Sequence, residues 1–355
     1  MHICFMLPGR APCSTERPGH STMEKLRFGI IGVGGRGMCN ARAVNAREDS
    51  ELVGTCDIRR ERLDLCDEEG IAGARFIDYT DLLDEGLDAV CINTDNNVHY
   101  EQTMAAAERG MHIYCEKPIA LTVAEAARMV EACEGLATVV NLSMRAAPEQ
   151  QLLRQVVREQ RYGRLLCVGA AHPKPSGLLV QGQGHRATND PAVWGPIIMH
   201  DGVHICEWLR FIGGEVRSVF AHTATTGPDP LNEEFINAVT THDDDVLGAL
   251  SYHAMPFIPT RQYAICEQAS LWPVRDEEGV RLHVARVGAE DEELPVPPRE
   301  LTGDAYYVDE FVRAIREGHQ PYGTMQDGYE GQRIVEAIRR SGQTGAIVDM
   351  GDVTG

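Results

Sequence analysis

Two short segments of the sequence hold side chains that could handle the proton of a hydroxyl group. In Cys115-Glu116-Lys117-Pro118 the lysine follows an apolar segment, and its ammonium could donate to two hydroxyl groups together, one of them on a substrate. In residues 199–208, His200 and His204 carry imidazole, a group that titrates near neutral pH and can accept a proton there. Together the segments predict the oxidation of an alcohol, with an imidazole as the proton acceptor.

Lysine is scarce in this chain, and that scarcity bears on Lys117. The other lysines are Lys25 and Lys174, and arginine fills nearly all other basic positions. A retained lysine suggests a need for a compact, titratable ammonium. The alternative is a surface lysine in a turn, but a position after a strand of the expected sheet favours a functional role. A cis bond before Pro118 would fix the direction of the lysine.

The histidine segment also has simpler interpretations. Asp201 could cap the N-terminus of the following helix, and either histidine could be a hydrogen-bonded core residue. His200, His204 and Glu207 could bind a metal ion, since two histidines and a carboxylate form a known ligand set. We favour proton transfer and expect no metal, because no further residue stands out that would orient such ligands.

A glycine-rich loop predicts that a bound cofactor takes part in this chemistry. The apolar run 28–31 leads directly into Gly-x-Gly-x-x-Gly, and an amphipathic segment follows. Glycines at these places let the backbone turn tightly, approach a pyrophosphate and pack the next helix close to the sheet. This context favours a dinucleotide site over a plain glycine turn. The residues expected to bind the cofactor here are Gly32, Val33, Gly34, Gly35, Arg36 and Gly37.

The type of dinucleotide depends on the end of the next predicted strand, residues 52–56. Asp57 follows that strand and lies 20 residues beyond Gly37. A carboxylate at this place suits the ribose hydroxyls of NAD and repels the 2′-phosphate of NADP. Arg59 and Arg60 could instead accommodate that phosphate. We therefore expect NAD, with NADP as the alternative.

Two patterns describe the elements that must position these residues. From residue 26 to residue 142, apolar segments typical of buried strands alternate with helical segments, one of which opens with a Thr122–Glu125 capping box. This alternation predicts an α/β fold with a doubly wound parallel sheet, a Rossmann domain. From residue 216 to about 296, short alternating runs between turn residues predict an α+β domain with a mostly antiparallel sheet.

Three parts of the chain follow from these patterns. Residues 1–22 mix Pro, Gly, Cys and charge without periodicity, and we expect a disordered or over-extended start that contributes nothing to the fold. Residues 23–142 form the expected NAD(P)-binding domain. Residues 143–355 form the expected α+β domain for substrate binding and oligomerisation.

Composition excludes several classes of partner. The 355-residue chain has a formal net charge of −20, which argues against nucleic acids and anionic membranes because both need basic patches. No apolar stretch approaches the length of a membrane span, and no secretory signal is recognisable. The 11 cysteines include no Cys-x-x-Cys pair, which predicts reduced thiols in the cytoplasm.

The order of these motifs resembles the Gfo/Idh/MocA family of nucleotide-dependent oxidoreductases, from about residue 25 to residue 350. The glycine loop occurs in many families, whereas Glu116-Lys117-Pro118 followed by a later Asp-Gly-x-His element is more specific. The resemblance also rests on Asn96-x-x-His99, Arg145 with Pro148, residues 307–311, Asp327-Gly328 and residues 337–341.

The resemblance implies a Rossmann domain, a second domain with an open sheet, and hydride transfer between a nicotinamide and a hydroxyl or keto carbon of a sugar, inositol or related polyol. Lys117 would be the catalytic lysine and His204 the acid/base, with Asp201 and His200 beside them. Family members often carry aspartate where this chain has His200, which leaves the orienting partner of His204 open. The further cofactor-binding residues implied are Asp57, Arg59, Thr94, Asn96, His99, Glu116 and Lys117.

The substrate pocket is expected to be unusual. Asp95 stands where the family usually has proline, and Gly195-Pro196 replaces its usual Gly-Gly. The polar loop 182–189 could border the pocket, although it could equally be a solvated loop. The substrate-binding residues expected are Lys117, Arg145, His185, Arg186, Trp194, Asp201 and His204.

Two other functions would use the same residues differently. A tightly held NAD that oxidises a sugar transiently and is reduced back would make the protein a redox-neutral glycosidase, lyase or epimerase. A non-catalytic, dinucleotide-responsive protein would need Lys117 and His204 to be incidental. In every case the open sheet face is expected to be buried on another subunit, in a homodimer or homotetramer.

Overall fold

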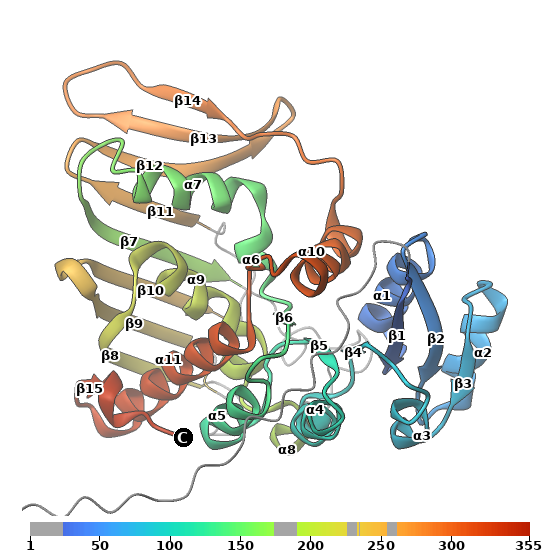
Figure 1. The fold of residues 1–355 in the computed structure, drawn as a ribbon. Coiled ribbons are helices and arrows are strands. Elements are labelled where there is room, and N and C mark those ends of the chain that lie inside the picture. Colours follow the sequence, from blue (N-terminus) through green and yellow to red (C-terminus); the bar gives the residue numbers. More distant parts are fainter. Residues whose placement is uncertain (1–23, 174–189, 226–232, 234, 254–260) are drawn as a thin grey trace, which may run out of the picture.

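A computed structural model describes residues 24–173, 190–225, 233, 235–253 and 261–355. Two sheets organise this part of the chain (Figure 1). The predictions for residues 1–22 and for the loop 182–189, with His185 and Arg186, lie outside the described residues. None of the described helices is both long and apolar enough to cross a membrane.

The first sheet is parallel and has helices on both faces. Its strands lie in the order β3-β2-β1-β4-β5-β6. The strand order therefore reverses between β1 and β4, and doubly wound sheets bind ligands at this switch point. The sequence prediction of this fold is confirmed. The strands are β1 (Leu26–Ile31), β2 (Ser50–Cys56), β3 (Ala74–Phe76), β4 (Ala89–Ile92), β5 (His112–Cys115) and β6 (Thr138–Val140), and the helices between them are α1 (Gly35–Asn45), α2 (Arg60–Glu68), α3 (Tyr79–Leu83), η1 (Asn96–Val98), α4 (His99–Glu108) and α5 (Val123–Ala132).

Local signals set the limits of these helices. The Thr122 side chain accepts a hydrogen bond from the Glu125 N–H, and the Glu125 side chain accepts one from the Thr122 N–H, so the predicted capping box is present. Gly110, just beyond α4, has a φ of +69°, a conformation that suits glycine at a helix end. Such signals are local and can therefore be read from the sequence.

The second sheet is mixed and mostly antiparallel, as predicted. Its order is β14-β13-β12-β11-β7-β10-β9-β8-β15, and β7 with β10 is the parallel pair among the described strands. Its strands are β7 (Leu165–Pro173), β8 (Val216–Ala224), β9 (Phe235–His242), β10 (Leu247–His253), β11 (Arg261–Cys266), β12 (Ala269–Asp276), β13 (Gly279–Arg286), β14 (Glu292–Pro295) and β15 (Val348–Asp349). The helices of this part are α6 (Ser143–Ala146), α7 (Pro148–Arg158), α8 (Pro191–Trp194), η3 (Ile198–Gly202), α9 (Val203–Gly213), η4 (Asp243–Asp245), α11 (Met325–Thr344) and η5 (Met350–Asp352).

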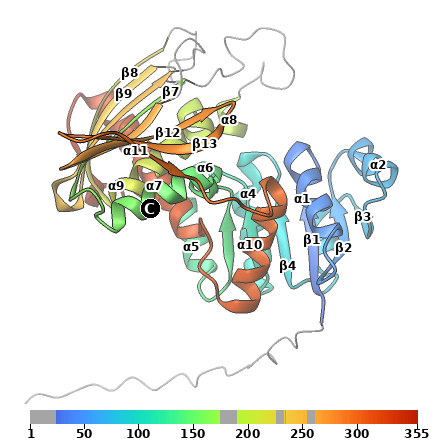
Figure 2. The same ribbon diagram turned by 90° about the horizontal axis from the view of Figure 1, so that it is seen from above.

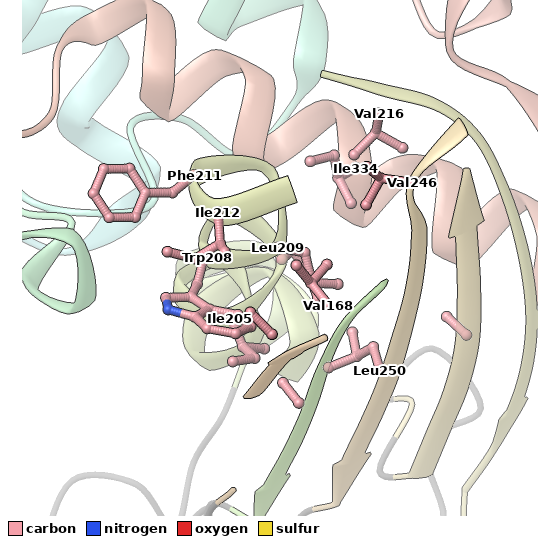
Figure 3. Packing of buried hydrophobic residues seen from close by; sticks show 14 of the residues in the cluster. Val168, Ile205, Trp208, Leu209, Phe211, Ile212, Val216, Val246, Leu250 and Ile334 are labelled. Carbon is pink, nitrogen blue, oxygen red and sulfur yellow. The ribbon is translucent and has the colours of Figure 1, made fainter. Parts of the chain in front are cut away.

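Helices α9 and α11 cover one face of this sheet and close its core (Figures 1 and 3). Trp208 and Leu209 of α9 are fully buried and belong to the same apolar cluster as Val168 of β7 and Leu250 of β10 (Figure 3). Helix α9 carries the predicted histidine segment at its start, so this packing fixes where that segment lies.

The opposite face of the second sheet carries apolar side chains that the described residues leave exposed. Val239 of β9 is 55 % exposed and Leu247 of β10 is 57 % exposed. The register places Val239 beside Phe220 of β8 and Ala249 of β10, so an apolar row crosses three strands. Within the part of the chain that the structure describes, the sheet is therefore open on this face, as the resemblance implied.

Helix α10 (Gly303–Glu317) follows β14 of the second sheet in sequence but packs against the first sheet (Figure 2). Phe311 meets Phe28 of β1 edge to face, with ring centroids 5.9 Å apart. Val308 and Val312 belong to the same cluster. These residues form an apolar stripe at helical spacing that must be buried, and the face of the first sheet beside α1 buries it.

Candidate active site

The glycine loop follows β1 and is shaped to approach a ligand closely. Gly32 has a φ of +79°, in the left-handed region, and a Cβ on Gly37 would lie 1.7 Å from the carbonyl oxygen of Gly32. At Gly34 and Gly35 nothing lies within 4 Å of a Cβ position. Helix α1 begins there without a side-chain cap, so its first N–H groups and the open glycines fit a pyrophosphate.

Asp57 follows β2 and fixes this loop in place. Its Oδ2 accepts a hydrogen bond from the Val33 N–H at 3.1 Å, and its Oδ1 accepts one from the Arg59 N–H at 3.0 Å. Only 5 % of the side chain is exposed. Each carboxylate oxygen can accept a further hydrogen bond, so the geometry leaves capacity for ribose hydroxyls.

The arginines beside the loop differ in their partners. Arg36 pairs with Asp304 of α10, with Nη1 and Oδ1 3.0 Å apart, and half of its side chain is exposed. Arg59 Nε lies 3.5 Å from Asp57 Oδ1. Both guanidinium groups therefore lie at the carboxyl edge of the first sheet, beside the loop that would hold the phosphates.

Lys117 follows β5 at the same edge of the sheet. The Lys117–Pro118 peptide bond is cis, as the sequence suggested. Its Nζ donates a hydrogen bond to the backbone carbonyl oxygen of His200 at 2.7 Å. The preceding Glu116 is buried, and its Oε1 accepts from Nδ2 of Asn141 at 2.6 Å. The lysine thus reaches from the first sheet to the segment that carries the histidines.

His99 ties the loop after β4 to the loop that carries Lys117. Its ring is fully buried, with Nδ1 2.8 Å from the carbonyl oxygen of Pro118 and Nε2 3.1 Å from that of Thr94. Burial lowers the pKa of His99, although both carbonyl contacts oppose this shift. Thr94 in turn donates from Oγ1 to Oε1 of Gln102 at 2.6 Å. The predicted cofactor contacts of His99 and Thr94 stay predictions.

The histidine segment contains a π-helical turn, which the sequence did not reveal. His200 and Asp201 lie in η3, and the carbonyl oxygen of Pro196 accepts from the N–H groups of both Met199 and His200. The N-cap of α9 is Gly202, without a side-chain cap, so the suggestion that Asp201 caps this helix is wrong. A π-turn inserts an extra residue and often marks a functional site. Here it lies directly before His204.

Asn96 links the loop after β4 to this segment. Its Nδ2 donates to the carbonyl oxygen of Trp194 at 2.7 Å and lies 3.0 Å from Nδ1 of His200. The Trp194 ring meets the His200 ring edge to face at 5.3 Å. The structure therefore brings the predicted residues Asn96, Lys117, Trp194 and His200 together.

Arg145 lies in a buried ion-pair network that joins α6, α9 and α11. Its Nη1 is 2.8 Å from Oδ2 of Asp327, and its Nε is 3.3 Å from Oε2 of Glu207. Nη1 of Arg210 lies 2.9 Å from both Oε1 of Glu207 and Oδ1 of Asp327. This placement gives Arg145 a structural role, and its predicted contact with substrate stays a prediction.

Sequence reasoning missed this network, although one signal pointed to it. Glu207 and Arg210 are the carboxylate and guanidinium side chains of the mostly apolar α9, spaced to face one another. Burial raises the pKa of Glu207 to about 7, and Arg145 and Arg210 oppose the shift. For Asp327 the arginines outweigh burial and lower the pKa to about 2. Two carboxylates and two arginines thus share one buried site.

The metal alternative needed Glu207 as a ligand beside the histidines. Both oxygens of that carboxylate lie instead against arginines. Among the described residues there is also no group of three or more His, Cys, Asp or Glu side chains arranged to hold a metal ion. The site as described has imidazole, ammonium and carboxylate groups for proton transfer.

Comparisons with known proteins agree with this arrangement. Residues 26–143 match the model of an oxidoreductase family with an NAD-binding Rossmann fold, GFO_IDH_MocA, and residues 150–265 match that of the GFO/IDH/MocA C-terminal domain. The chain is 26 % identical to D-glucoside 3-dehydrogenase of Escherichia coli over 93 % of its length and 99 % of the relative. It is 27 % identical to a D-xylose 1-dehydrogenase (NADP(+)) of Haloferax volcanii, over 92 % of this chain and all of the relative.

Solved structures share the fold over almost the whole chain. An oxidoreductase from Agrobacterium radiobacter, determined with NAD+, L-tartaric acid and magnesium, has a TM-score of 0.77 and 21 % identity over 92 % of this chain and 99 % of the other. Both family models, the two-sheet architecture and the Gly32–Gly37, Lys117 and His204 motifs point the same way. The chain belongs to the Gfo/Idh/MocA family of oxidoreductases.

Proposed function

We propose that this protein is an NAD-dependent dehydrogenase that transfers a hydride between the nicotinamide and a hydroxyl-bearing carbon of a sugar, inositol or related polyol. The observation that carries the proposal is the 2.7 Å contact from Nζ of Lys117 to the carbonyl oxygen of His200, four residues before His204. This contact joins the ammonium and the histidine segment at the edge of the sheet that holds the glycine loop. The sugar dehydrogenases among the relatives support the substrate class.

In the proposed reaction, His204 accepts the hydroxyl proton as the carbinol is oxidised. The ammonium of Lys117 stabilises the developing alkoxide through a charge-assisted hydrogen bond. Asp57 and the glycine loop hold the ribose and the pyrophosphate, and when bound the nicotinamide supplies the acceptor for the hydride. In the reverse direction the protonated imidazole of His204 returns the proton to the alkoxide, which the ammonium of Lys117 again stabilises.

NAD is the proposed cofactor because of Asp57. The carboxylate is held by two backbone N–H groups, so it cannot easily move away from a 2′-phosphate. Two observations favour NADP instead. The Haloferax relative is named for NADP(+), and Arg59 lies close enough to Asp57 to pair with a 2′-phosphate. A binding titration with both cofactors tests the choice: we expect the lower Kd for NAD, and a lower Kd for NADP would overturn it.

We further propose a homodimer or homotetramer in the cytoplasm. The apolar row through Phe220, Val239 and Ala249 is a face that another copy of the chain can bury. The cysteines among the described residues are all free thiols, which supports a reducing compartment.

Kinetics of two variants test the proposed roles. We expect Lys117→Ala and His204→Ala to abolish polyol-dependent reduction of NAD, measured by the absorbance of the reduced nicotinamide, while NAD binding largely persists. Lys25→Ala is the matched control, since this lysine is exposed just before β1. Near-normal rates in both site variants would reject the assignment, and turnover of a sugar without net NADH would support the redox-neutral glycosidase, lyase or epimerase instead.

A further inference from the structure

The proposed catalytic lysine is part of a set of contacts that crosses between the two sheets. Asn96, in the loop after β4, holds the carbonyl oxygen of Trp194 and Nδ1 of His200 with its amide, at 2.7 and 3.0 Å. Lys117, in the loop after β5, holds the carbonyl oxygen of His200 at 2.7 Å. Two neighbouring loops of the first sheet are thus attached to one short segment, residues 194–200.

Both the ring and the backbone of His200 are held in these contacts. Because Nδ2 of Asn96 can only donate, Nδ1 of His200 must accept, which assigns the proton of the neutral ring to Nε2. The Trp194 ring packs on the imidazole edge to face. Asn96 is 2 % exposed, so its amide must find its partners within the protein. An imidazole whose Nδ1 accepts this hydrogen bond is held in one orientation.

We propose that Asn96 and His200 form a latch that positions Lys117 for the reaction. Asn96 fixes the imidazole of His200, and the backbone of His200 fixes the ammonium of Lys117. His200 is then a positioning residue, and His204 alone accepts the proton. This inference rests on the catalytic role of Lys117 in the proposed function, and it assigns a role to the histidine that stands where relatives often carry aspartate.

The expected size of the effect follows from the contacts involved. A lysine side chain has many rotamers, and an unlatched ammonium spends part of its time away from the reacting oxygen. Loss of one neutral hydrogen bond in the latch corresponds to a fall in kcat of roughly three- to tenfold. In the His200 variants the Kd of NAD should change little, because the glycine loop and Asp57 are untouched and His200 is not among the residues expected to bind the cofactor.

Two substitutions of His200 separate positioning from proton transfer. In His200→Asn the amide oxygen can occupy the place of Nδ1 and accept the hydrogen bond from Asn96. In His200→Gln the longer side chain places its amide at the position of Nε2, so no acceptor is left for Asn96. We expect His200→Gln and Asn96→Leu to lower kcat roughly tenfold, and His200→Asn to lose clearly less. If His200 carried the reacting proton, both His200 variants would lose activity equally, and that outcome would overturn the proposal.

Chemical labelling of lysine gives a second readout that needs no turnover. The sequence contains three lysines, so reductive methylation with formaldehyde and a borohydride, mapped by mass spectrometry, resolves each one. Relative to the exposed Lys25, we expect Lys117 to be modified faster in His200→Gln and Asn96→Leu than in the wild type or His200→Asn. Equal Lys117 labelling in all four proteins would overturn the latch. A wild type that oxidises no polyol would instead reject the proposed function and leave the labelling result standing.

Discussion

Replacing Arg145 with methionine removes one of the two arginines from the buried ion-pair network and keeps much of the side chain's volume. The arginine bridges Asp327 and Glu207, at 2.8 and 3.3 Å, and its side chain is 8 % exposed. In the variant, Arg210 is the remaining arginine in contact with both carboxylates. Glu207 is 1 % exposed, so water cannot replace the lost partner.

The loss of stability should be large for a single substitution. Breaking a buried ion pair from one side costs about 3–5 kcal/mol, because the carboxylate left behind must either stay charged without its partner or take up a proton. That is a substantial part of the about 5–15 kcal/mol by which a folded domain is stable. Adding Glu207→Gln removes the uncompensated charge, so Arg145→Met/Glu207→Gln should recover at least about 1 kcal/mol relative to Arg145→Met alone.

Denaturant unfolding, followed by circular dichroism, measures these differences. Arg60→Met is the matched control, because Arg60 and Asp64 form an ion pair in which both side chains are more than half exposed. We expect that control to stay within about 0.5 kcal/mol of the wild type. A loss below about 1 kcal/mol for Arg145→Met, or no recovery in the double variant, would refute the reasoning.

Three further predictions follow from the described contacts. Burial raises the pKa of Glu207 from 4.5 to about 7, so between these pH values the folded state holds a proton that the unfolded state has released. The free energy of unfolding should therefore fall by up to about 3 kcal/mol as the pH rises from 4.5 through 7. Glu207→Gln should flatten this fall, and an unchanged pH profile in the variant would contradict the prediction. Gly37→Ala would place a Cβ 1.7 Å from the Gly32 carbonyl oxygen and should weaken NAD binding at least about tenfold in a titration, whereas an unchanged Kd would contradict the loop's role. Val239→Glu, in the open sheet face, should dissociate the oligomer in light scattering, and a monomeric wild type would count against the proposed interface.

The sequence predicted those parts of the fold that depend on contiguous residues. The strand–glycine–helix unit at residues 26–45 and the Thr122–Glu125 capping box could be read because each is a local pattern. The alternation of such units then predicted the parallel sheet. The antiparallel sheet followed from short alternating strands and their turns, and its order, with β7 in parallel with β10, depended on distant pairings.

Features that arise from contacts between distant segments could not be predicted. The π-turn around His200 has no sequence pattern, so Asp201 looked like a helix cap. The ion pairs of Arg145 could not be foreseen because its partners, Glu207 and Asp327, come much later in the chain. The contact of Asn96 with His200 likewise needs both sheets in place.

The transfer of the hydride itself is the most direct test of the proposed function. The protein would be incubated with NAD and a panel of sugars and inositols deuterated at their carbinol carbons, and the reduced nicotinamide would be quantified and examined by mass spectrometry. We expect net reduced nicotinamide in amounts equal to the oxidised substrate, with the deuterium on the nicotinamide ring. Turnover without accumulation of reduced nicotinamide, or reduction without transfer of deuterium, would contradict it.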